Sequence, residues 1–335
     1  MREAMLYERQ GDGTVACRLC AHRCLIKDRK RGVCGVRENR GGTLYSLVYG
    51  AVVAENVDPI EKKPLFHLYP ASRSYSIATV GCNFRCLFCQ NADISQLPRE
   101  RGEIVGRFTA PEVIVEGALR SQCRTISYTY TEPTVFFEYA YDVARLAVGK
   151  GLMNVFVTNG YMTAEALETI APYLHAANVD LKSFRDDFYR SQCGARLEPV
   201  LSTLREMKKR GIWVEVTTLV IPGLNDSEGE LREIAAFIAD LGRETPWHVS
   251  RFHPRYRLRD REATPAETIY RAVAIGKEAG LKYVYSGNIP GGHGEDTFCS
   301  RCASPLISRY GFFVRETRLD GNRCLKCKTP LEGVF

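Results

Sequence analysis

The chain has 335 residues, of which 45% are hydrophobic and 25% charged, a balance that excludes a disordered protein and allows one large core with appendages. No apolar run approaches the roughly 18 residues that a membrane helix needs, and the first ten residues lack the apolar core of a signal peptide, so we expect a cytoplasmic protein with no membrane partner. The net charge of +7 is modest for this length and favours neither nucleic acid nor an acidic protein partner.

The 13 cysteines fall into groups with the spacing of metal ligands, which indicates a reducing compartment. The first group is Cys17, Cys20, Cys24 and Cys34. It lies in a basic segment that has little to bury, and a metal would supply the folding energy that such a segment lacks. We predict zinc at this group, and a second Fe–S cluster is the alternative. A third interpretation is that the four cysteines are separate buried thiols that bind no metal.

Residues 44–56 are rich in β-branched and aromatic side chains and predict a strand or hairpin. Apolar strand-like runs then alternate with helical stretches, near 75–80, 125–131, 154–159, 177–182, 213–221, 246–252 and 283–288. Capping boxes are expected at three helix starts, pairing Thr109 with Glu112, Ser227 with Glu230 and Thr264 with Glu267.

Alternating strands and helices predict a parallel sheet with right-handed crossovers. The predicted fold class is α/β, a partial TIM-like (β/α)6 barrel with an extra strand, a Cys-rich N-terminal segment and a zinc-ribbon-like C-terminal module. The expected domains are residues 1–73, 74–290 and 291–335. In such a barrel the active site forms where the strands end.

The central motif is CNFRCLFCQN, in which Cys82, Cys86 and Cys89 follow the first barrel strand. Fe–S clusters are usually held by four thiolates, so three would leave one iron open to a small molecule. A structural zinc site is the alternative, but such sites use four ligands and paired CxxC knuckles. The motif resembles that of the radical S-adenosylmethionine (SAM) superfamily, which implies the barrel fold, a [4Fe–4S] cluster and reductive cleavage of SAM to a 5′-deoxyadenosyl radical.

The resemblance also implies cofactor-binding residues, beginning with Phe88 beside the third cysteine. YTYTEP occupies the place of the family's GGEP-like motif, with Tyr130 and Thr131 instead of glycines, and assigns Thr131 and Glu132 to SAM. Asn159 follows the third strand and is either a cofactor ligand or part of a simple turn.

Asp180 and Lys182 resemble the DLK motif of glycyl-radical-enzyme activases and are expected to face the barrel interior and bind SAM. Thr218, in the strand before a VPGxxD-like turn, is likewise assigned to the cofactor. His253, at the end of the sixth strand, matches a histidine of the activases and is the candidate catalytic residue.

The C-terminal residues contain two CxxC knuckles, Cys299 with Cys302 and Cys324 with Cys327. Paired knuckles are typical of a zinc ribbon, which either binds a partner or simply stabilises the end of the barrel.

Taken together, the motifs along nearly the whole chain resemble those of the radical enzyme of the AmmeMemoRadiSam system, a group similar to pyruvate formate-lyase activating enzymes. The resemblance implies a radical SAM oxidoreductase with an unidentified substrate, an electron donor such as flavodoxin or ferredoxin, and AMMECR-like and Memo-like protein partners. A glycyl-radical activase is one alternative. A nucleic-acid-binding or RNA-modifying protein is the other, and we consider nucleic acid an improbable partner because the chain contains no recognised motif for it.

Overall fold

A computed structural model describes residues 1–289 and 294–335. Its centre is a nine-stranded sheet in which seven strands pair in parallel in chain order. These strands are β8 (Arg73–Thr79), β10 (Thr125–Tyr128), β11 (Met153–Thr158), β12 (Ala176–Asp180), β13 (Trp213–Val220), β14 (Trp247–Arg251) and β15 (Val284–Gly287). The expected alternation of parallel strands and helices is therefore confirmed, with strand bounds within a few residues of those predicted.

Two antiparallel strands extend the sheet beyond β8. β7 (Ala51–Pro59) pairs with β8, and the short β9 (Arg107–Phe108) pairs with β7. The strand or hairpin predicted within residues 44–56 corresponds to part of β6 (Thr43–Ser46) and the first residues of β7. The sheet is thus mixed at one edge and parallel everywhere else.

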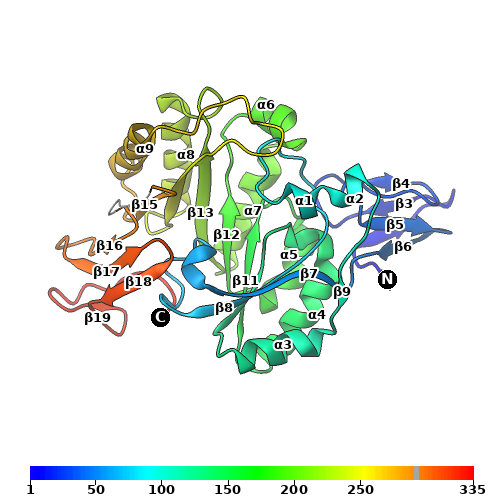
Figure 1. Ribbon diagram of the computed structural model, residues 1–335, viewed down its shortest axis with the longest axis horizontal. Coiled ribbons are helices and arrows are strands. Elements are labelled where there is room, and N and C mark those ends of the chain that lie inside the picture. Colours follow the sequence, from blue (N-terminus) through cyan, green and yellow to red (C-terminus); the bar gives the residue numbers. More distant parts are fainter. Residues whose placement is uncertain (290–293) are drawn as a thin grey trace.

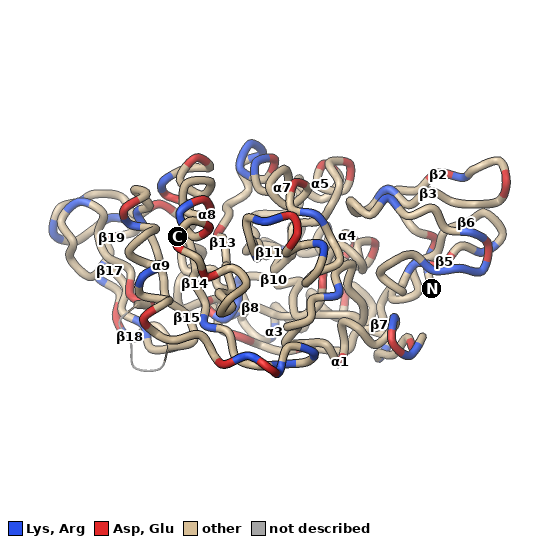
Figure 2. Tube along the Cα trace, turned by 90° about the horizontal axis from the view of Figure 1, so that it is seen from above, with Lys and Arg blue, Asp and Glu red and all other residues tan. Residues whose placement is uncertain are grey.

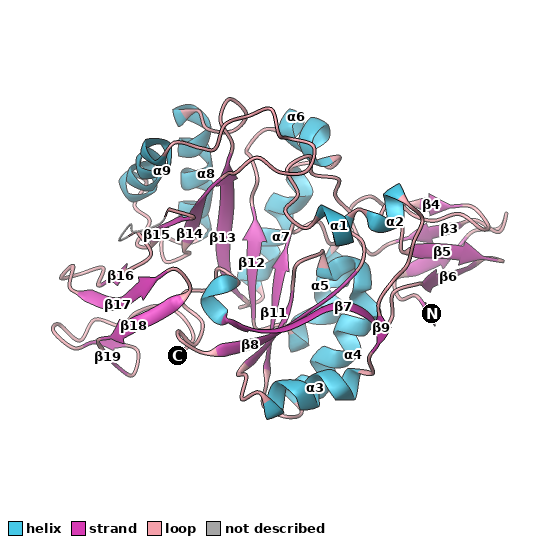
Figure 3. Ribbon diagram, in the orientation of Figure 1, coloured by secondary structure: helices cyan, strands magenta, loops and turns pink. Residues whose placement is uncertain are grey.

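Helices connect successive parallel strands, and the longer ones lie outside the curved sheet (Figure 3). They are α1 (Ala92–Ser95), α2 (Leu97–Glu100), α3 (Pro111–Arg120), α4 (Phe137–Val148), α5 (Ala164–Ile170), α6 (Asp186–Phe188), α7 (Glu198–Lys209), α8 (Glu228–Leu241) and α9 (Ala266–Glu278). Short 3-10 turns occur at Ile60–Lys62, Pro133–Phe136 and Ala171–Tyr173, and a π turn at Tyr189–Cys193. The apolar stripes of the longer helices pack on the sheet and leave its other face to the site.

One of the three predicted helix caps forms. The Ser227 hydroxyl accepts a hydrogen bond from the Glu230 amide at 3.4 Å at the start of α8. Thr109 and Thr264 do not cap, because α3 and α9 begin two residues further on, after Ala110 and Pro265. The Thr264 hydroxyl instead donates to the Val220 carbonyl at 2.6 Å and so ties this loop to β13.

Small β-modules lie at opposite ends of the molecule (Figure 1). The N-terminal module has two three-stranded sheets, formed by β1 (Arg2–Glu3), β6 (Thr43–Ser46) and β5 (Arg37–Arg40), and by β2 (Tyr7–Arg9), β3 (Val15–Cys17) and β4 (Leu25–Ile26). The C-terminal module contains β16 (Thr297–Phe298), β17 (Pro305–Tyr310), β18 (Phe313–Thr317), β19 (Leu319–Asp320) and β20 (Arg323–Cys324). The expected boundary between residues 290 and 291 lies outside the described residues.

The C-terminal module joins the sheet through a buried cluster. Leu306 and Ile307 pack with Phe66 and Tyr285, and the buried Arg309 guanidinium donates to the Phe66 carbonyl at 2.9 Å. Apolar burial and the hydrogen bonds of the Arg309 Nη atoms therefore fix the module to the end of the barrel.

Acidic residues stand among the basic ones along most of the loops visible from above (Figure 2). Within the described part of the chain, no helix has the length and apolar character needed to cross a membrane.

Candidate functional site

The CxxxCxxC segment forms a loop between β8 and α1, at the carboxyl end of the first parallel strand. It carries Cys82, Cys86 and Cys89, of which Cys86 is buried and the other two are half-buried. The Arg85 amide donates to the Cys193 carbonyl at 2.9 Å, which fixes the middle of the loop against the segment after β12. The three thiols therefore lie where the active site of a barrel of parallel strands forms.

The spacing of these thiols does not suit a single ion. Among residues 1–289 and 294–335, only the C-terminal cysteines form a set of three or more potential ligands with all donor atoms within 4.8 Å of one another. Sulfurs that share one zinc ion lie about 3.8 Å apart, given a Zn–S bond of about 2.3 Å. In an iron–sulfur cluster the thiolates bind different irons and stand further apart, so the arrangement of Cys82, Cys86 and Cys89 fits a cluster.

A buried donor in the same loop also lacks an acceptor. Asn83 is 1% exposed, and its Nδ2 has no hydrogen-bond partner among the described residues. An unsatisfied buried donor is costly, and a cluster or cofactor at the thiols would offer an acceptor nearby. The loop therefore fits a bound group.

The structure adds Cys193 to this site, although its local sequence carries no motif. The buried Cys193 thiol shares a hydrogen bond with the Cys86 sulfur, which lowers the pKa of the Cys86 thiol despite burial. Burial and the same contact raise the pKa of the Cys193 thiol well above its usual range. A fourth sulfur thus lies beside the central cysteine of the motif.

Glu132 is buried where β10 leads into the next helix. Its Oε1 accepts hydrogen bonds from the Thr134 amide at 3.1 Å and the Thr158 hydroxyl at 2.7 Å, and its Oε2 accepts from the Asn159 amide at 2.8 Å. Burial raises the pKa of the Glu132 carboxyl, although these hydrogen bonds oppose the shift. Glu132 therefore joins the ends of β10 and β11, and its assignment to SAM stays a prediction.

Asn159 reaches the cysteine loop directly. Its Nδ2 donates to Asn83 Oδ1 at 2.7 Å and lies 3.8 Å from Cys82 Sγ, while its Oδ1 accepts from the Tyr161 amide at 3.1 Å. The Asn159 side chain thus shapes the turn after β11 and contacts the cysteine loop, and its assignment to the cofactor stays a prediction.

Asp180 and Lys182 form an ion pair at the end of β12, with 2.7 Å between Lys182 Nζ and Asp180 Oδ2. Lys182 Nζ also lies 5.9 Å from the centre of the buried Phe88 ring. Burial alone would lower the pKa of Lys182, but Asp180 and the neighbouring thiols outweigh burial and raise it well above its usual range. The lysine therefore stays a cation beside the cysteine loop.

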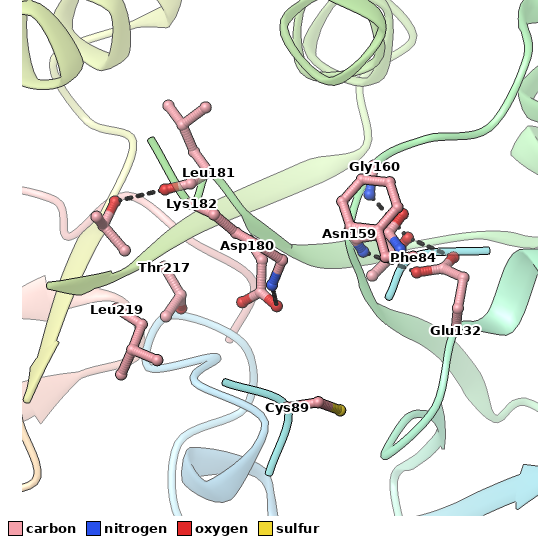
Figure 4. A network of polar contacts seen from close by, with 12 residues as sticks. Phe84, Cys89, Glu132, Asn159, Gly160, Asp180, Leu181, Lys182, Thr217 and Leu219 are labelled. Atoms are coloured by element: carbon pink, nitrogen blue, oxygen red, sulfur yellow. Dashed lines mark hydrogen bonds and ion pairs between the residues drawn. The ribbon is translucent and has the colours of Figure 1, made fainter. Parts of the chain in front are cut away.

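Figure 4 shows these groups together, with Asp180, Lys182 and Thr217 on one side of the view, Glu132, Asn159 and Phe84 on the other, and Cys89 below and between them. They come from the cysteine loop and from the carboxyl ends of four neighbouring strands. The predicted residues of β10, β11 and β12 are therefore brought together with the cysteine loop.

The two residues that replace the family's glycines take different roles. Tyr130 has φ +62°, the left-handed conformation that glycine normally supplies. Its hydroxyl hydrogen-bonds with Asp58 and its ring lies 4.6 Å from Lys63 Nζ, so side-chain contacts hold the strained backbone. Thr131 is buried and donates to the Thr79 carbonyl at 2.8 Å, which leaves its assignment to SAM a prediction.

The prediction for Thr218 is wrong, because this residue lies on the opposite face of β13. Its hydroxyl donates to the Leu181 carbonyl and accepts from the Trp247 indole, each at 2.9 Å. Trp247 packs against α9, so Thr218 faces the helices. Successive side chains of a strand alternate between faces, and the site face of β13 carries Thr217 and Leu219, which the sequence analysis missed (Figure 4).

His253 is exposed in the loop after β14. Among the residues that the structure describes, we find no hydrogen bond or ion pair between His253 and the cysteine loop. The catalytic role of His253 stays a prediction. The neighbouring Arg251 donates a hydrogen bond to the carbonyl of Thr264, which lies in the loop between β14 and α9.

The C-terminal cysteines form a compact group. Cys299 Sγ lies 3.5 Å from Cys327 Sγ, and Cys302 Sγ lies 3.8 Å from Cys324 Sγ. These separations match those of four thiolates around one tetrahedral ion, so this group is able to bind a metal.

The N-terminal cysteines are also brought together, but around a pocket. Cys17, Cys20, Cys24 and Cys34 all line it. Arg99 joins the neighbouring Val33 to Cys82, so the pocket lies beside the cysteine loop of the barrel.

The profile of the Radical SAM superfamily matches residues 76–238, which contain the cysteine loop and the strands that carry the site. The chain belongs to this superfamily and is a radical SAM enzyme, with a mostly parallel sheet typical of its partial barrel. Membership implies a [4Fe–4S] cluster and SAM.

Among its relatives, the uncharacterized protein MJ0808 of Methanocaldococcus jannaschii is 50% identical over 338 residues and matches along 100% of both chains. The pyruvate formate-lyase 1-activating enzyme of Escherichia coli is 20% identical over 61% of this chain and 89% of its own length. A solved radical SAM methyltransferase from Sphaerobacter thermophilus shares the fold, with a TM-score of 0.51 and 16% identity over 65% of this chain and 67% of that one.

Proposed function

We propose that Cys82, Cys86 and Cys89 hold the [4Fe–4S] cluster and leave one iron open to SAM. The observation that carries the proposal is the spread arrangement of these three thiols at the carboxyl end of β8, where polar side chains of the neighbouring strands converge on them. When bound, the cluster and SAM together supply a 5′-deoxyadenosyl radical, which takes a hydrogen atom from a substrate.

The side chains around the loop suit the charged end of SAM. The Lys182 ammonium, held by Asp180, offers a cation for the methionyl carboxylate, and the Asp180 carboxylate offers an acceptor for the methionyl amine. The Asn83 amide, which lacks an acceptor, points to a further contact on the cluster side. Phe88 and its neighbour Phe188, with ring centres 5.9 Å apart, shield the loop from water.

Spectroscopy of the reduced protein tests this assignment. Anaerobically reconstituted protein should show the electron paramagnetic resonance (EPR) signal of a reduced four-iron cluster, and SAM should change that signal because it binds the open iron. In Lys182→Met the cluster signal should persist, but a higher SAM concentration should be needed for the change. A signal that SAM leaves unchanged in the wild-type protein would contradict the open iron.

Within the superfamily, we propose that the chain is the radical enzyme of the AmmeMemoRadiSam system, with AMMECR-like and Memo-like partners and a one-electron donor such as flavodoxin or ferredoxin. The motifs quoted above and the compact C-terminal cysteine group support the proposal. We also propose zinc at Cys299, Cys302, Cys324 and Cys327. Co-purification of the full chain with its partners, followed by zinc analysis, tests both points.

Activation of a glycyl radical enzyme is a second candidate, favoured by the similarity to the pyruvate formate-lyase 1-activating enzyme. An activase leaves a persistent radical on the backbone of its partner, whereas a modifying enzyme gives a closed-shell product. EPR of the isolated partner after the reaction distinguishes the two.

A further inference from the structure

The N-terminal cysteine pocket lies between the N-terminal module and the 3-10 turn Pro133–Phe136 that precedes α4. Cys17 is buried, and Cys20, Cys24 and Cys34 are half-buried. Four thiols that converge on one pocket point to a bound inorganic group.

The spacing of these thiols argues against a single ion. No three of them have sulfur atoms within 4.8 Å of one another, since within residues 1–289 and 294–335 only the C-terminal group meets that condition. The C-terminal group and the three cysteines of the barrel loop serve as references within the same chain. Like the three cysteines of the cluster motif, the N-terminal group does not meet this condition, whereas the compact C-terminal group, which suits one tetrahedral ion, does.

The lining of the pocket also suits a cluster. The remaining wall is largely apolar and includes Leu19, Ile26, Val33 and Val135. Apolar surroundings and hydrogen bonds to sulfur are the means by which proteins hold Fe–S clusters and tune their potentials. The Val33 amide lies 3.5 Å from Cys24 Sγ as such a donor.

Arg37 places a buried positive charge at the wall of the pocket. It is 1% exposed, its Nη1 donates to Cys17 Sγ at 3.2 Å, and it forms an ion pair with the buried Glu138. Its Nε is buried in the wall of the pocket and has no hydrogen-bond partner among the described residues. The bridging sulfides of a cluster are acceptors beyond the four thiolates, whereas a zinc ion adds none, so a cluster accounts better for the unpaired Nε.

The pocket also shares a wall with the cysteine loop of the barrel. Arg99 Nη2 donates both to the Val33 carbonyl at 2.7 Å and to the Cys82 carbonyl at 3.2 Å, and so joins the two cysteine groups. Gly81 has φ +105°, and a Cβ built on it would lie 3.4 Å from the Cys34 carbonyl oxygen. The backbones of the two groups are therefore in contact.

From these observations we propose that Cys17, Cys20, Cys24 and Cys34 hold a four-iron cluster rather than zinc. All four irons would have a protein thiolate, so this cluster would leave no iron open to SAM. Because the two groups have separate ligands, substitutions in one group test its cluster separately from the cluster of the barrel loop.

Metal analysis of the full chain tests the proposal without any substitution. Protein reconstituted anaerobically with iron and sulfide should contain about eight iron atoms, about eight sulfides and about one zinc ion per chain. About four iron atoms and two zinc ions would overturn the proposal, and so would about six iron atoms, which indicate a two-iron cluster.

Two variants assign the iron to its ligands. The triple variant Cys82→Ala, Cys86→Ala, Cys89→Ala should keep about half of the iron, and its cluster signal should not respond to SAM. Cys24→Ser should lose the other half, while the matched control Cys123→Ser, a buried thiol outside the groups, should lose none. Complete loss of iron from a folded triple variant would overturn the N-terminal cluster, whereas full iron in Cys24→Ser would exclude Cys24 as a ligand.

Discussion

The carboxylate of Glu132 accepts a hydrogen bond from the backbone amide of Asn159 at 2.8 Å. This contact links the end of β10 to the end of β11. The Asn159 side chain in turn contacts the loop of Cys82. The position of this loop therefore depends on the Glu132 carboxylate, although Glu132 acts on it only through Asn159.

Glu132→Gln should therefore destabilise the protein. A glutamine amide has one acceptor oxygen, so its NH₂ group would face one of the donors that now surround the carboxylate. We expect the free energy of unfolding to fall by about 1–3 kcal/mol, measured by denaturant unfolding under anaerobic conditions. Glu112→Gln on the exposed side of α3 is the matched control and should stay within about 0.5 kcal/mol of wild type; an equal loss in both variants would refute the explanation.

Lys182→Met should weaken SAM binding about tenfold or more, since it removes the cation beside the cysteine loop and leaves Asp180 unpaired. Equilibrium dialysis of SAM against reconstituted protein measures the effect. Lys150→Met replaces an exposed lysine after α4 and should bind SAM as the wild type does. Unchanged affinity in the Lys182 variant would remove Lys182 from the cofactor site.

The ion pair of Asp58 with Lys63, whose charged atoms lie 2.6 Å apart, should make the stability of the protein fall in acid. Burial alone would raise the pKa of the Asp58 carboxyl, but Lys62, Lys63 and Tyr130 outweigh it and hold the pKa well below its usual range. A lowered folded-state pKa contributes stability above the unfolded pKa of about 3.9, and this stability is lost as the pH falls further.

Asp58→Asn should accordingly lose about 1–3 kcal/mol of stability at neutral pH and show a shallower loss below about pH 4. Asp187→Asn, at a side chain that is 97% exposed, is the control. Parallel acid-unfolding curves for wild type and Asp58→Asn would show that the pair does not stabilise the fold.

Cys324→Ser should release the metal of the C-terminal module. Since metal binding adds directly to folding free energy in small modules, we expect loss of about one zinc ion per chain and rapid proteolysis within residues 294–335. The barrel should keep its iron. Zinc retained in this variant at the level of the Cys123→Ser control would place the metal elsewhere.

The barrel was predictable because its strands are short segments rich in apolar and β-branched residues that alternate with helical stretches, a local property of the sequence. The edge strand β9 was missed, since two residues carry no period and pair only after β7 is in place. Thr109 and Thr264 have the spacing of helix caps, but α3 and α9 begin later. For Thr264, a tertiary hydrogen bond to β13 takes the place of the local cap.

Within the site, motifs led to the cysteines, Glu132, Asn159, Asp180 and Lys182 because these residues follow strands that end at one edge of the sheet. The same approach failed at Thr218, where an error of one residue reverses the face of a strand. It gave no means of placing Cys193, whose contact with Cys86 depends on how two distant loops fold together.

The central claim is that the three loop cysteines support reductive cleavage of SAM. The most direct test is the amount of 5′-deoxyadenosine formed when anaerobically reconstituted protein is reduced in the presence of SAM, with Cys86→Ala as the control. The account predicts 5′-deoxyadenosine from the wild type and only background from Cys86→Ala. A folded wild-type protein that contains its iron but forms no more than the variant would contradict it.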